Sequence, residues 1–150
     1  GRMDIWSPHL TVAAIVEDAG RFLLVEEYAG GEELVYNQPA GHLDPHETLA
    51  AAAIREALEE TAWEIEVHAI VGIYYWTHPK GHTFVRTCFA AKALRHHAGQ
   101  ALDEGIQRAV WLTRDEIAAL GPKLRSPMVL RCIDDYLAGQ RHSLDLFNYL

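Results

Sequence analysis

The chain has 150 residues and a mass of 16.8 kDa, which suits one domain over residues 1–150 with a core large enough to need no disulfide cross-links. Hydrophobic residues make up 49% of the chain and charged residues 23%, values that exclude a disordered protein. The 13 Lys and Arg against 21 Asp and Glu give a net charge of −8. This charge argues against binding to nucleic acid or to an anionic membrane surface, because phosphate binding needs clustered cations.

The cysteines and the start of the chain indicate a cytoplasmic protein, which we expect to be monomeric. Cys88 and Cys132 form no CxxC pair, so we expect both thiols to be reduced, although one disulfide is also compatible with the sequence. No apolar run approaches the ~18 residues of a membrane span, and we expect no signal peptide. Gly1 and Arg2 precede Met3, and we interpret them as an artificial extension outside the fold.

Two apolar, β-branched runs, residues 9–17 and 21–27, predict a β-hairpin. The turn between them contains Gly20, which allows a positive φ. Residues 28–33 carry two glycines and two acidic residues and predict an exposed loop. Residues 34–38 predict a short strand, which the Pro-Ala-Gly sequence after them should end.

Residues 48–61 predict a helix, because this segment is rich in Ala, Leu, Glu and Arg. Its expected start has Asp44 as the N-cap, Pro45 at the first helical position and Glu47 as the capping-box residue. An apolar stripe on this helix should pack on the sheet. The predicted stripe consists of Ala50, Ile54, Ala57 and Leu58.

The second half of the chain predicts three more strands and two more helices. The strands are residues 65–76, 83–94 and 106–112, with a turn at 78–81 between the first two. A capping-box sequence beginning at Thr113 opens a short helix that ends at the Gly-Pro pair 121–122, and a last helix covers residues 127–137. This order of elements predicts an α/β domain with a mixed sheet.

Three glutamates of the first predicted helix are the most informative feature of the chain. At 100° per residue, Glu56, Glu59 and Glu60 fall within one ~100° arc, opposite the predicted apolar stripe. Carboxylates on a rigid helix suit hard divalent cations such as Mg²⁺, which can clamp a phosphate chain and activate water. A solvated acidic surface is the alternative, and the residues around the glutamates decide between the two.

The spacing of these surrounding residues resembles the signature of the Nudix hydrolase family. The matching positions are Gly41, Glu47, Arg55, Glu56, Ala57, Glu59 and Glu60. The chain departs from the signature at Ala62, where the family has glycine, and at Trp63, where an aliphatic residue is usual. The resemblance implies an α+β fold in which helices sandwich a mixed β-sheet. It also implies a hydrolase that needs Mg²⁺, or Mn²⁺ as a substitute.

A closer resemblance, which extends beyond the signature, is to one phosphatase branch of the family. The segments that carry it are residues 37–43, 47–49, 124–127 and 139–141, together with the first predicted strand. The resemblance implies a small phosphorylated substrate, with hydrolysis of phosphoanhydride bonds in nucleoside tri- and diphosphates, thiamine pyrophosphate and hydroxymethylpyrimidine pyrophosphate. The alternatives are another Nudix pyrophosphatase, acting on dinucleotides or sugar nucleotides, and a non-catalytic module that senses nucleotides.

The resemblance also assigns roles to individual residues. Glu56, Glu59 and Glu60 match the family's metal-binding positions and are the expected metal ligands. The backbone carbonyl of Ala40 is an expected further ligand. Gly41 would let the loop pass close to the metal and the phosphate, where a Cβ would intrude.

The side chains near these ligands have both functional and structural interpretations. Arg55 could orient a metal-binding glutamate through a charge-assisted hydrogen bond, or form an ordinary i,i+4 pair with Glu59. Glu47 fits a capping box and also a salt bridge to Arg55. The helix glutamates and the late-loop acids Asp103 and Glu104 are candidates for a further ligand or the general base, and we include Glu104 among the catalytic residues.

Aromatic side chains are candidates for stacking on a base or pyrimidine ring. Because strand side chains alternate, Tyr74 and Trp76 should share one face of their strand and Tyr75 the other. Tyr36 is a fourth candidate. The histidines match no zinc-binding spacing, so we expect no histidine metal site.

Overall fold

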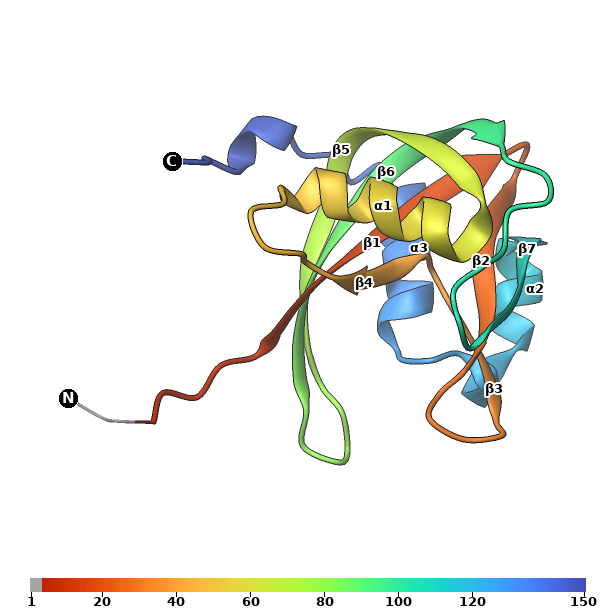
Figure 1. Ribbon diagram of the computed structural model, residues 1–150, viewed down its shortest axis with the longest axis horizontal. Coiled ribbons are helices and arrows are strands. Elements are labelled where there is room, and N and C mark those ends of the chain that lie inside the picture. The colour runs from red at the N-terminus through yellow and green to blue at the C-terminus, as the bar shows by residue number, and fades with distance from the viewer. Residues whose placement is uncertain (1–3) are drawn as a thin grey trace.

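In the computed structural model, which describes residues 4–150, a mixed β-sheet lies between helices on its two faces (Figure 1). Helix α1 (Leu49–Thr61) packs on one face, and α3 (Met128–Leu137) packs on the other, beside the shorter α2 (Arg114–Ala119). This layering confirms the predicted fold class. The interpretation of Gly1 and Arg2 as an extension lies outside the described residues.

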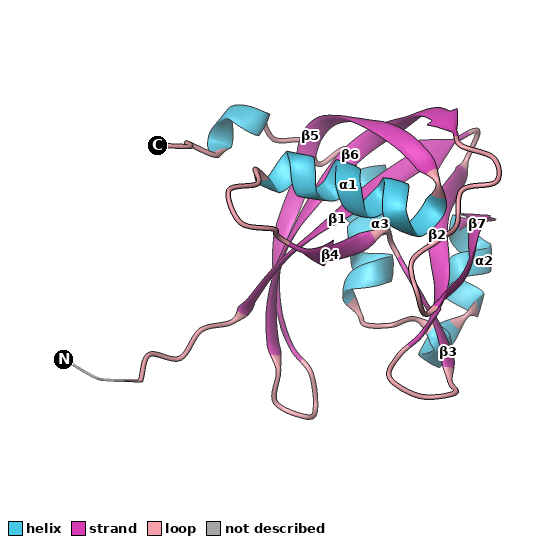
Figure 2. Cartoon of the chain, in the orientation of Figure 1, coloured by secondary structure: helices cyan, strands magenta, loops and turns pink. Residues whose placement is uncertain are grey.

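Seven strands make up the sheet, and Figure 2 shows them between the helices. They are β1 (His9–Asp18), β2 (Arg21–Tyr28), β3 (Leu34–Asn37), β4 (Ala40–His42), β5 (Trp63–Thr77), β6 (Thr83–His96) and β7 (Ile106–Thr113). The order is β3-β2-β1-β6-β5, with β4 paired to β1 and β7 to β2. Only the β1–β6 pair among these is parallel. The central position of β1 explains its apolar run, because both of its faces are covered.

The predicted strands and helices are all present, with ends that are unchanged or shifted by a few residues. The capping box at Thr113 is also present, because its hydroxyl accepts from the Glu116 amide and the Glu116 carboxylate accepts from the Thr113 amide. Strand β4 was not predicted. Its three residues have no β-strand pattern of their own, and they become a strand by pairing with residues 11–13 of β1. A 3-10 turn at Leu144–Leu146 was also not predicted.

Helix α1 begins later than the sequence predicts, so the assignment of Asp44 as N-cap and Pro45 as the first helical residue is wrong. The N-cap is Thr48, whose hydroxyl accepts a hydrogen bond from the Ala51 amide at 3.1 Å. His46 has a φ of 65°, which no α-helix accommodates. Glu47 still accepts a hydrogen bond from the Asp44 amide, at 2.9 Å, but it closes the loop before the helix.

The buried stripe of α1 also differs from the prediction. Its buried residues are Leu49, Ala52, Ala53, Ala57 and Thr61, whereas Ala50, Ile54 and Leu58 are only partly buried. The alanines allow the helix to lie close to the sheet, against Val12, Ile70 and Phe89. At 100° per residue, Glu56 and Glu60 then fall on the buried side, beside the alanines. The helix therefore turns two of the three glutamates toward the protein and not into solvent.

The end of α1 explains one departure from the family signature. Ala62 is the C-cap and adopts a left-handed conformation, with a φ of 62°, while its amide donates to the Leu58 carbonyl at 2.9 Å. Glycine is the usual residue in this conformation because a Cβ makes it unfavourable by about 1 kcal/mol. Alanine at this position therefore strains the cap without touching the glutamates.

Two properties expected from composition can be compared with the structure. Cys88 and Cys132 are both buried and unpaired, as expected for reduced thiols. Within residues 4–150 there is no helix with the length and apolar character needed to cross a membrane.

Candidate active site

The loop that contains β4 passes directly over α1 at Gly41. A Cβ added to Gly41 would lie 2.3 Å from the Glu56 carboxyl carbon, well inside van der Waals contact. The glycine is therefore required by the Glu56 carboxylate itself. Because the two groups are in contact, the position of the loop and the position of Glu56 depend on each other.

The next residue of the loop holds Glu60. The amide of Ala40 donates a hydrogen bond to a Glu60 carboxylate oxygen at 2.9 Å. Burial raises the pKa of Glu60 to about 9, although the bond from Ala40 favours the ionised form. A divalent cation beside this carboxylate would oppose the shift, since it stabilises the ionised form.

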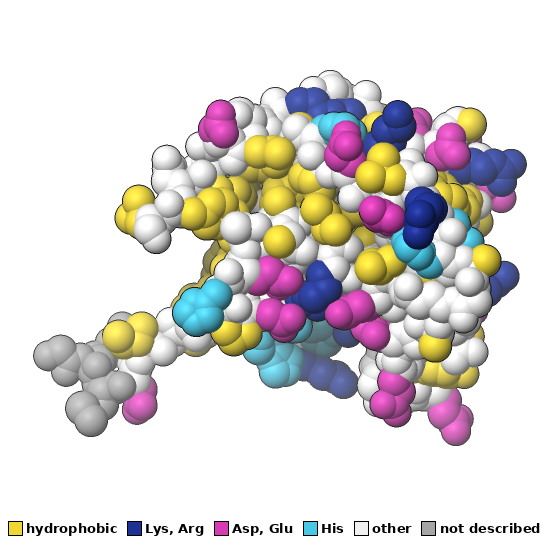
Figure 3. Space-filling model, turned by 45° about the horizontal axis from the view of Figure 1, so that its top comes forward, with side chains coloured by type: hydrophobic (Ala, Val, Ile, Leu, Met, Phe, Trp, Pro, Cys, Tyr) yellow, Lys and Arg dark blue, Asp and Glu magenta, His cyan; other side chains and the backbone are white. Residues whose placement is uncertain are grey.

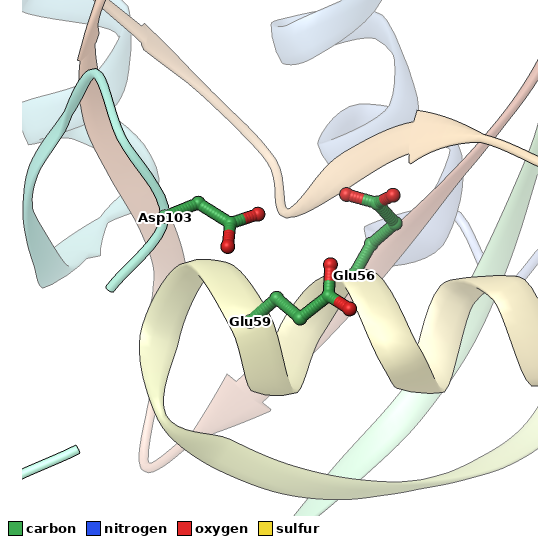
Figure 4. Close-up of side chains that lie close together, drawn as sticks. All are labelled: Glu56, Glu59 and Asp103. Carbon is green, nitrogen blue, oxygen red and sulfur yellow. The ribbon is translucent and has the colours of Figure 1, made fainter. Parts of the chain in front are cut away.

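Three carboxylates converge near the C-terminal half of α1 (Figure 4). Glu56, Glu59 and Asp103 each offer an oxygen, and these atoms lie within 4.8 Å of one another. Asp103 belongs to the loop before β7, and its amide donates to the Glu59 carbonyl at 3.0 Å, which anchors the loop on the helix. Hard oxygen donors in this number suit Mg²⁺ or a similar cation. The residues present therefore fit a divalent metal.

This cluster brings together part of the predicted ligand set. Glu60 lies one turn from Glu56 and is bonded to Ala40, so it is not one of the three converging carboxylates. The late-loop acid in the cluster is Asp103, and its neighbour Glu104 is exposed.

Arg55 holds the acidic side chains in place. Its guanidinium donates to Glu47 at 2.8 and 3.0 Å, to Glu56 at 2.7 Å and to Glu59 at 3.2 Å. It also donates to the His42 carbonyl at 2.9 Å and pairs with Asp44 at 3.1 Å. The orienting bond and the i,i+4 pair expected as alternatives are therefore both present, as is the salt bridge to Glu47. In the space-filling view, acidic side chains surround a basic one near the middle of the face shown (Figure 3).

Burial and the ion pair with Arg55 have opposite effects on the pKa of Glu56. Burial raises the pKa of Glu56, and the hydrogen bond from Arg55 opposes the rise. The side chain is 13% exposed, compared with 41% for Glu59. Glu59 is thus the carboxylate of the helix that water can approach most easily.

A cavity of about 520 Å³ lies beside these residues. Glu56, Glu60 and the loop at residues 40–42 line one part of it, and Trp76, Phe84 and Met128 line another. An acidic region and an aromatic region therefore share one cavity, and its volume is typical of a pocket for a small ligand.

The four aromatic candidates have different positions. Trp76 lines the cavity, whereas Tyr36 donates to Glu26, and Tyr74 donates to Asp135 at 2.8 Å. Tyr75 is 70% exposed on the opposite face, so the predicted alternation along β5 is confirmed. Of these four, Trp76 is the one placed to contact a ligand in the cavity.

Sequence reasoning missed two arginines of the cavity wall, Arg86 and Arg125. Arg125 pairs with the buried carboxylate of Glu27. Arg86 is almost fully buried and donates to the side-chain oxygens of Gln38 and Asn37 at 2.8 and 2.9 Å. The signal available in the sequence was a single charged residue, an arginine, inside an otherwise uncharged strand, residues 83–91.

The fold, the glycine loop and the glutamate helix agree with comparisons to known proteins. The sequence profile of the NUDIX domain matches residues 7–132. The chain therefore belongs to the Nudix hydrolase family, as its signature predicted, and it is a hydrolase.

Individual proteins of known name or structure show which members of the family this chain is similar to. Phosphatase NudJ of Escherichia coli (strain K12) is 38% identical over 142 residues, which cover 95% of this chain and 92% of the relative. The solved structure of a NUDIX hydrolase from Nitrosomonas europaea is 42% identical, with a TM-score of 0.94, and the match covers 96% of this chain and 98% of the other. A UDP-X diphosphatase structure, at 15% identity and a TM-score of 0.72 over 93% of this chain and 68% of its own, shares the fold alone.

Proposed function

We propose that this hydrolase cleaves phosphoanhydride bonds in nucleoside tri- and diphosphates and in pyrimidine pyrophosphates such as thiamine pyrophosphate. The convergence of the Glu56, Glu59 and Asp103 carboxylates, of which Glu56 also lines the 520 Å³ cavity, carries this proposal. The similarity to Phosphatase NudJ over nearly the whole chain supports it. We further propose that the protein works as a monomer in the cytoplasm on small phosphorylated molecules.

The proposed cofactor is Mg²⁺, with Mn²⁺ as a substitute. Glu56, Glu59 and Asp103 would hold it, and Glu60 and the carbonyl of Ala40 are proposed as further ligands next to them. A bound divalent cation supplies charge neutralisation on phosphate oxygens and lowers the pKa of bound water. Without such a cation, an acidic cavity wall would repel a phosphate chain.

The remaining chemistry belongs to the chain itself. Arg55 fixes the orientation of Glu56 and Glu59, so the carboxylates need little rearrangement during the reaction. Glu59 and Asp103 are the more exposed members of the cluster, and we assign to this pair the acceptance of a proton from the attacking water. Trp76 offers a ring on which a base or pyrimidine can stack, and stacking tolerates different rings.

The test is a time course of product formation from GTP and from thiamine pyrophosphate. With Mg²⁺, we expect both to be hydrolysed, with orthophosphate as a direct product and GDP accumulating before GMP. Excess EDTA should abolish the activity, and Ca²⁺ should support it poorly because its coordination is looser. GMP appearing first without GDP would assign the chain to a different Nudix pyrophosphatase activity, and full activity in EDTA would disprove the metal assignment.

A further inference from the structure

Arg86 is a buried cation in the wall of the cavity. The residue lies on β6 and is 4% exposed, and it lines the same cavity as Glu56 and Trp76. Its two terminal nitrogens donate to the neutral side chains of Gln38 and Asn37. Its third nitrogen, Nε, is buried and has no hydrogen-bond partner among residues 4–150.

No carboxylate among the described residues bonds directly to Arg86, although its charge acts on the buried Glu27 and opposes the rise that burial causes in the pKa of that carboxyl. The other arginine of the cavity wall, Arg125, pairs with Glu27, but within the described part of the chain Arg86 forms no ion pair. Removing a charge from water without pairing it is costly, so buried arginines normally have an anionic partner. An anion that enters the cavity from solvent would supply this partner.

The surroundings of Arg86 hold its guanidinium in a fixed orientation. Gln38 is 1% exposed, and while its oxygen accepts from Arg86, its nitrogen donates to the Val129 carbonyl of α3 at 2.7 Å. Asn37 is 8% exposed and holds the second terminal nitrogen. These two residues lie next to the loop that contacts Glu56 and Glu60, so the cation and the acidic cluster are connected through one short segment. A group held in advance in this way binds a ligand without further ordering.

We propose that Arg86 binds an anionic phosphoryl oxygen of the substrate, at a position in the cavity distinct from the Glu56, Glu59 and Asp103 cluster. This inference rests on the proposed function, because it deepens the assignment of a diphosphate-containing substrate. One phosphoryl group lies at the carboxylate cluster, and a neighbouring one contacts the guanidinium. A substrate with two linked phosphates therefore satisfies both ends of the site, and a monophosphate satisfies one.

The test measures binding of methylenediphosphonate, which has two linked phosphoryl groups, no ring and no hydrolysable bond. Calorimetry in Mg²⁺ compares the wild type with Arg86→Met, Arg86→Lys and a control, Arg108→Met. Arg108 is an exposed arginine that pairs with Glu26 outside the cavity wall. We expect Arg86→Met to weaken binding about 10- to 100-fold, the effect of one charge-assisted hydrogen bond with its charge. Arg86→Lys, which keeps the charge without the planar fork, should be intermediate, and Arg108→Met should bind as the wild type does.

A purely structural role for Arg86 makes a different prediction. It would lower the melting temperature of both Arg86 variants while leaving the affinity of the folded protein unchanged, and that result overturns the proposal. If Arg86→Met does not fold, Arg86→Lys decides by the same criterion. Absence of diphosphonate binding to the wild type also overturns it. Failure of the proposed function is a separate result, in which the wild type releases no phosphate from GTP or thiamine pyrophosphate while diphosphonate binding still depends on Arg86.

Discussion

Two arginines near the cavity have opposite electrostatic surroundings. Arg55, on α1, donates to three glutamates and to a backbone carbonyl, and it pairs with Asp44 as well. Arg86, on β6, is more deeply buried and donates hydrogen bonds to two neutral amide side chains. The same side chain therefore occurs once bonded to several carboxylates and once bonded to none.

This difference separates two tasks that an arginine can perform in a phosphate-processing site. The donors of Arg55 are used within the protein, so Arg55 orients carboxylates and has little capacity left for a substrate. Arg86 has no bonded carboxylate, and the carboxylate that its charge affects, Glu27, is already paired with Arg125, so Arg86 suits an incoming anion. Substitutions of the carboxylates that Arg55 orients should therefore reduce kcat, and substitutions of Arg86 should mainly raise KM.

The largest effect should come from the carboxylates that Arg55 holds. Glu56→Gln and Glu59→Gln should each lower kcat by at least ~10²-fold, or roughly 2.7 kcal/mol, because an amide removes one preorganised charge. Both variants should remain folded. Steady-state kinetics with GTP in Mg²⁺ measure the effect, and near-wild-type turnover of both variants would remove the basis for assigning the metal to this cluster.

A smaller effect should come from moving one of these carboxylates without changing its charge. Gly41→Ala places a Cβ where the Glu56 carboxylate lies, so the Glu56 side chain must shift from its present position. We expect kcat to fall on the order of 10²-fold at most, the usual effect of a displacement of about 1 Å in a catalytic group. Gly31→Ala is the matched control, because nothing lies within 4 Å of its added Cβ and its φ is not positive. Equal kinetics for the two variants would contradict the close contact between Gly41 and Glu56.

Arg55→Lys should have a smaller effect still. Lysine keeps the positive charge but cannot span Glu47, Glu56 and Glu59 at once, so the carboxylates lose part of their orientation. We expect kcat to fall about tenfold with little change in KM, as for other residues that support metal ligands. Arg114→Lys, at a surface pair with Asp134, is the control. A rise in KM with unchanged kcat would show that Arg55 and Arg86 do not differ in role.

The smallest effect should be on the melting temperature of the metal-free protein. It tests the burial of Glu60. Since its folded pKa is about 9, above the ordinary value of 4.5, the folded state binds more protons than the unfolded state between these pH values. The free energy of unfolding should therefore fall as pH rises through this window, and Glu60→Gln should remove that dependence. In EDTA at pH 8, we expect its melting temperature to exceed the wild type's by a few degrees, at about 2–4 °C for each kcal/mol. Glu33→Gln, in an exposed loop, should show no such gain. The same dependence of melting temperature on pH in Glu60→Gln and the wild type would refute the prediction.

The sequence predicted the fold class, nearly all of the elements and the family, because these depend on local patterns. The hairpin at Gly20, the capping box at Thr113 and the alternation of Tyr74 to Trp76 each depend on a few neighbouring residues. The signature from Gly41 to Glu60 identified the family from spacing alone.

Other features depended on packing between distant segments. Strand β4 exists only because residues 40–42 pair with β1, and α1 rotates so that its alanines meet Phe89 and Ile70. Periodicity treats apolar residues as equal in size, so it placed Ile54 and Leu58 in the stripe and all three glutamates on the opposite side of the helix. The close approach of small residues instead brought Glu56 and Glu60 against the loop.

The sequence by itself therefore determined the family, and it predicts which residues carry the hydrolase chemistry, because the family signature is a pattern of spacings along one loop and one helix. Only the tertiary structure decided which late-loop acid joins the glutamates and which arginine of the cavity wall has no carboxylate bonded to it. The Asp103 amide donates to the Glu59 carbonyl, although residues 59 and 103 are 44 positions apart in the sequence. Arg86 donates to Asn37 and Gln38, which are also distant from it in the sequence. The charge balance of a buried group depends on what folding brings next to it, and that is not encoded in any short stretch of chain.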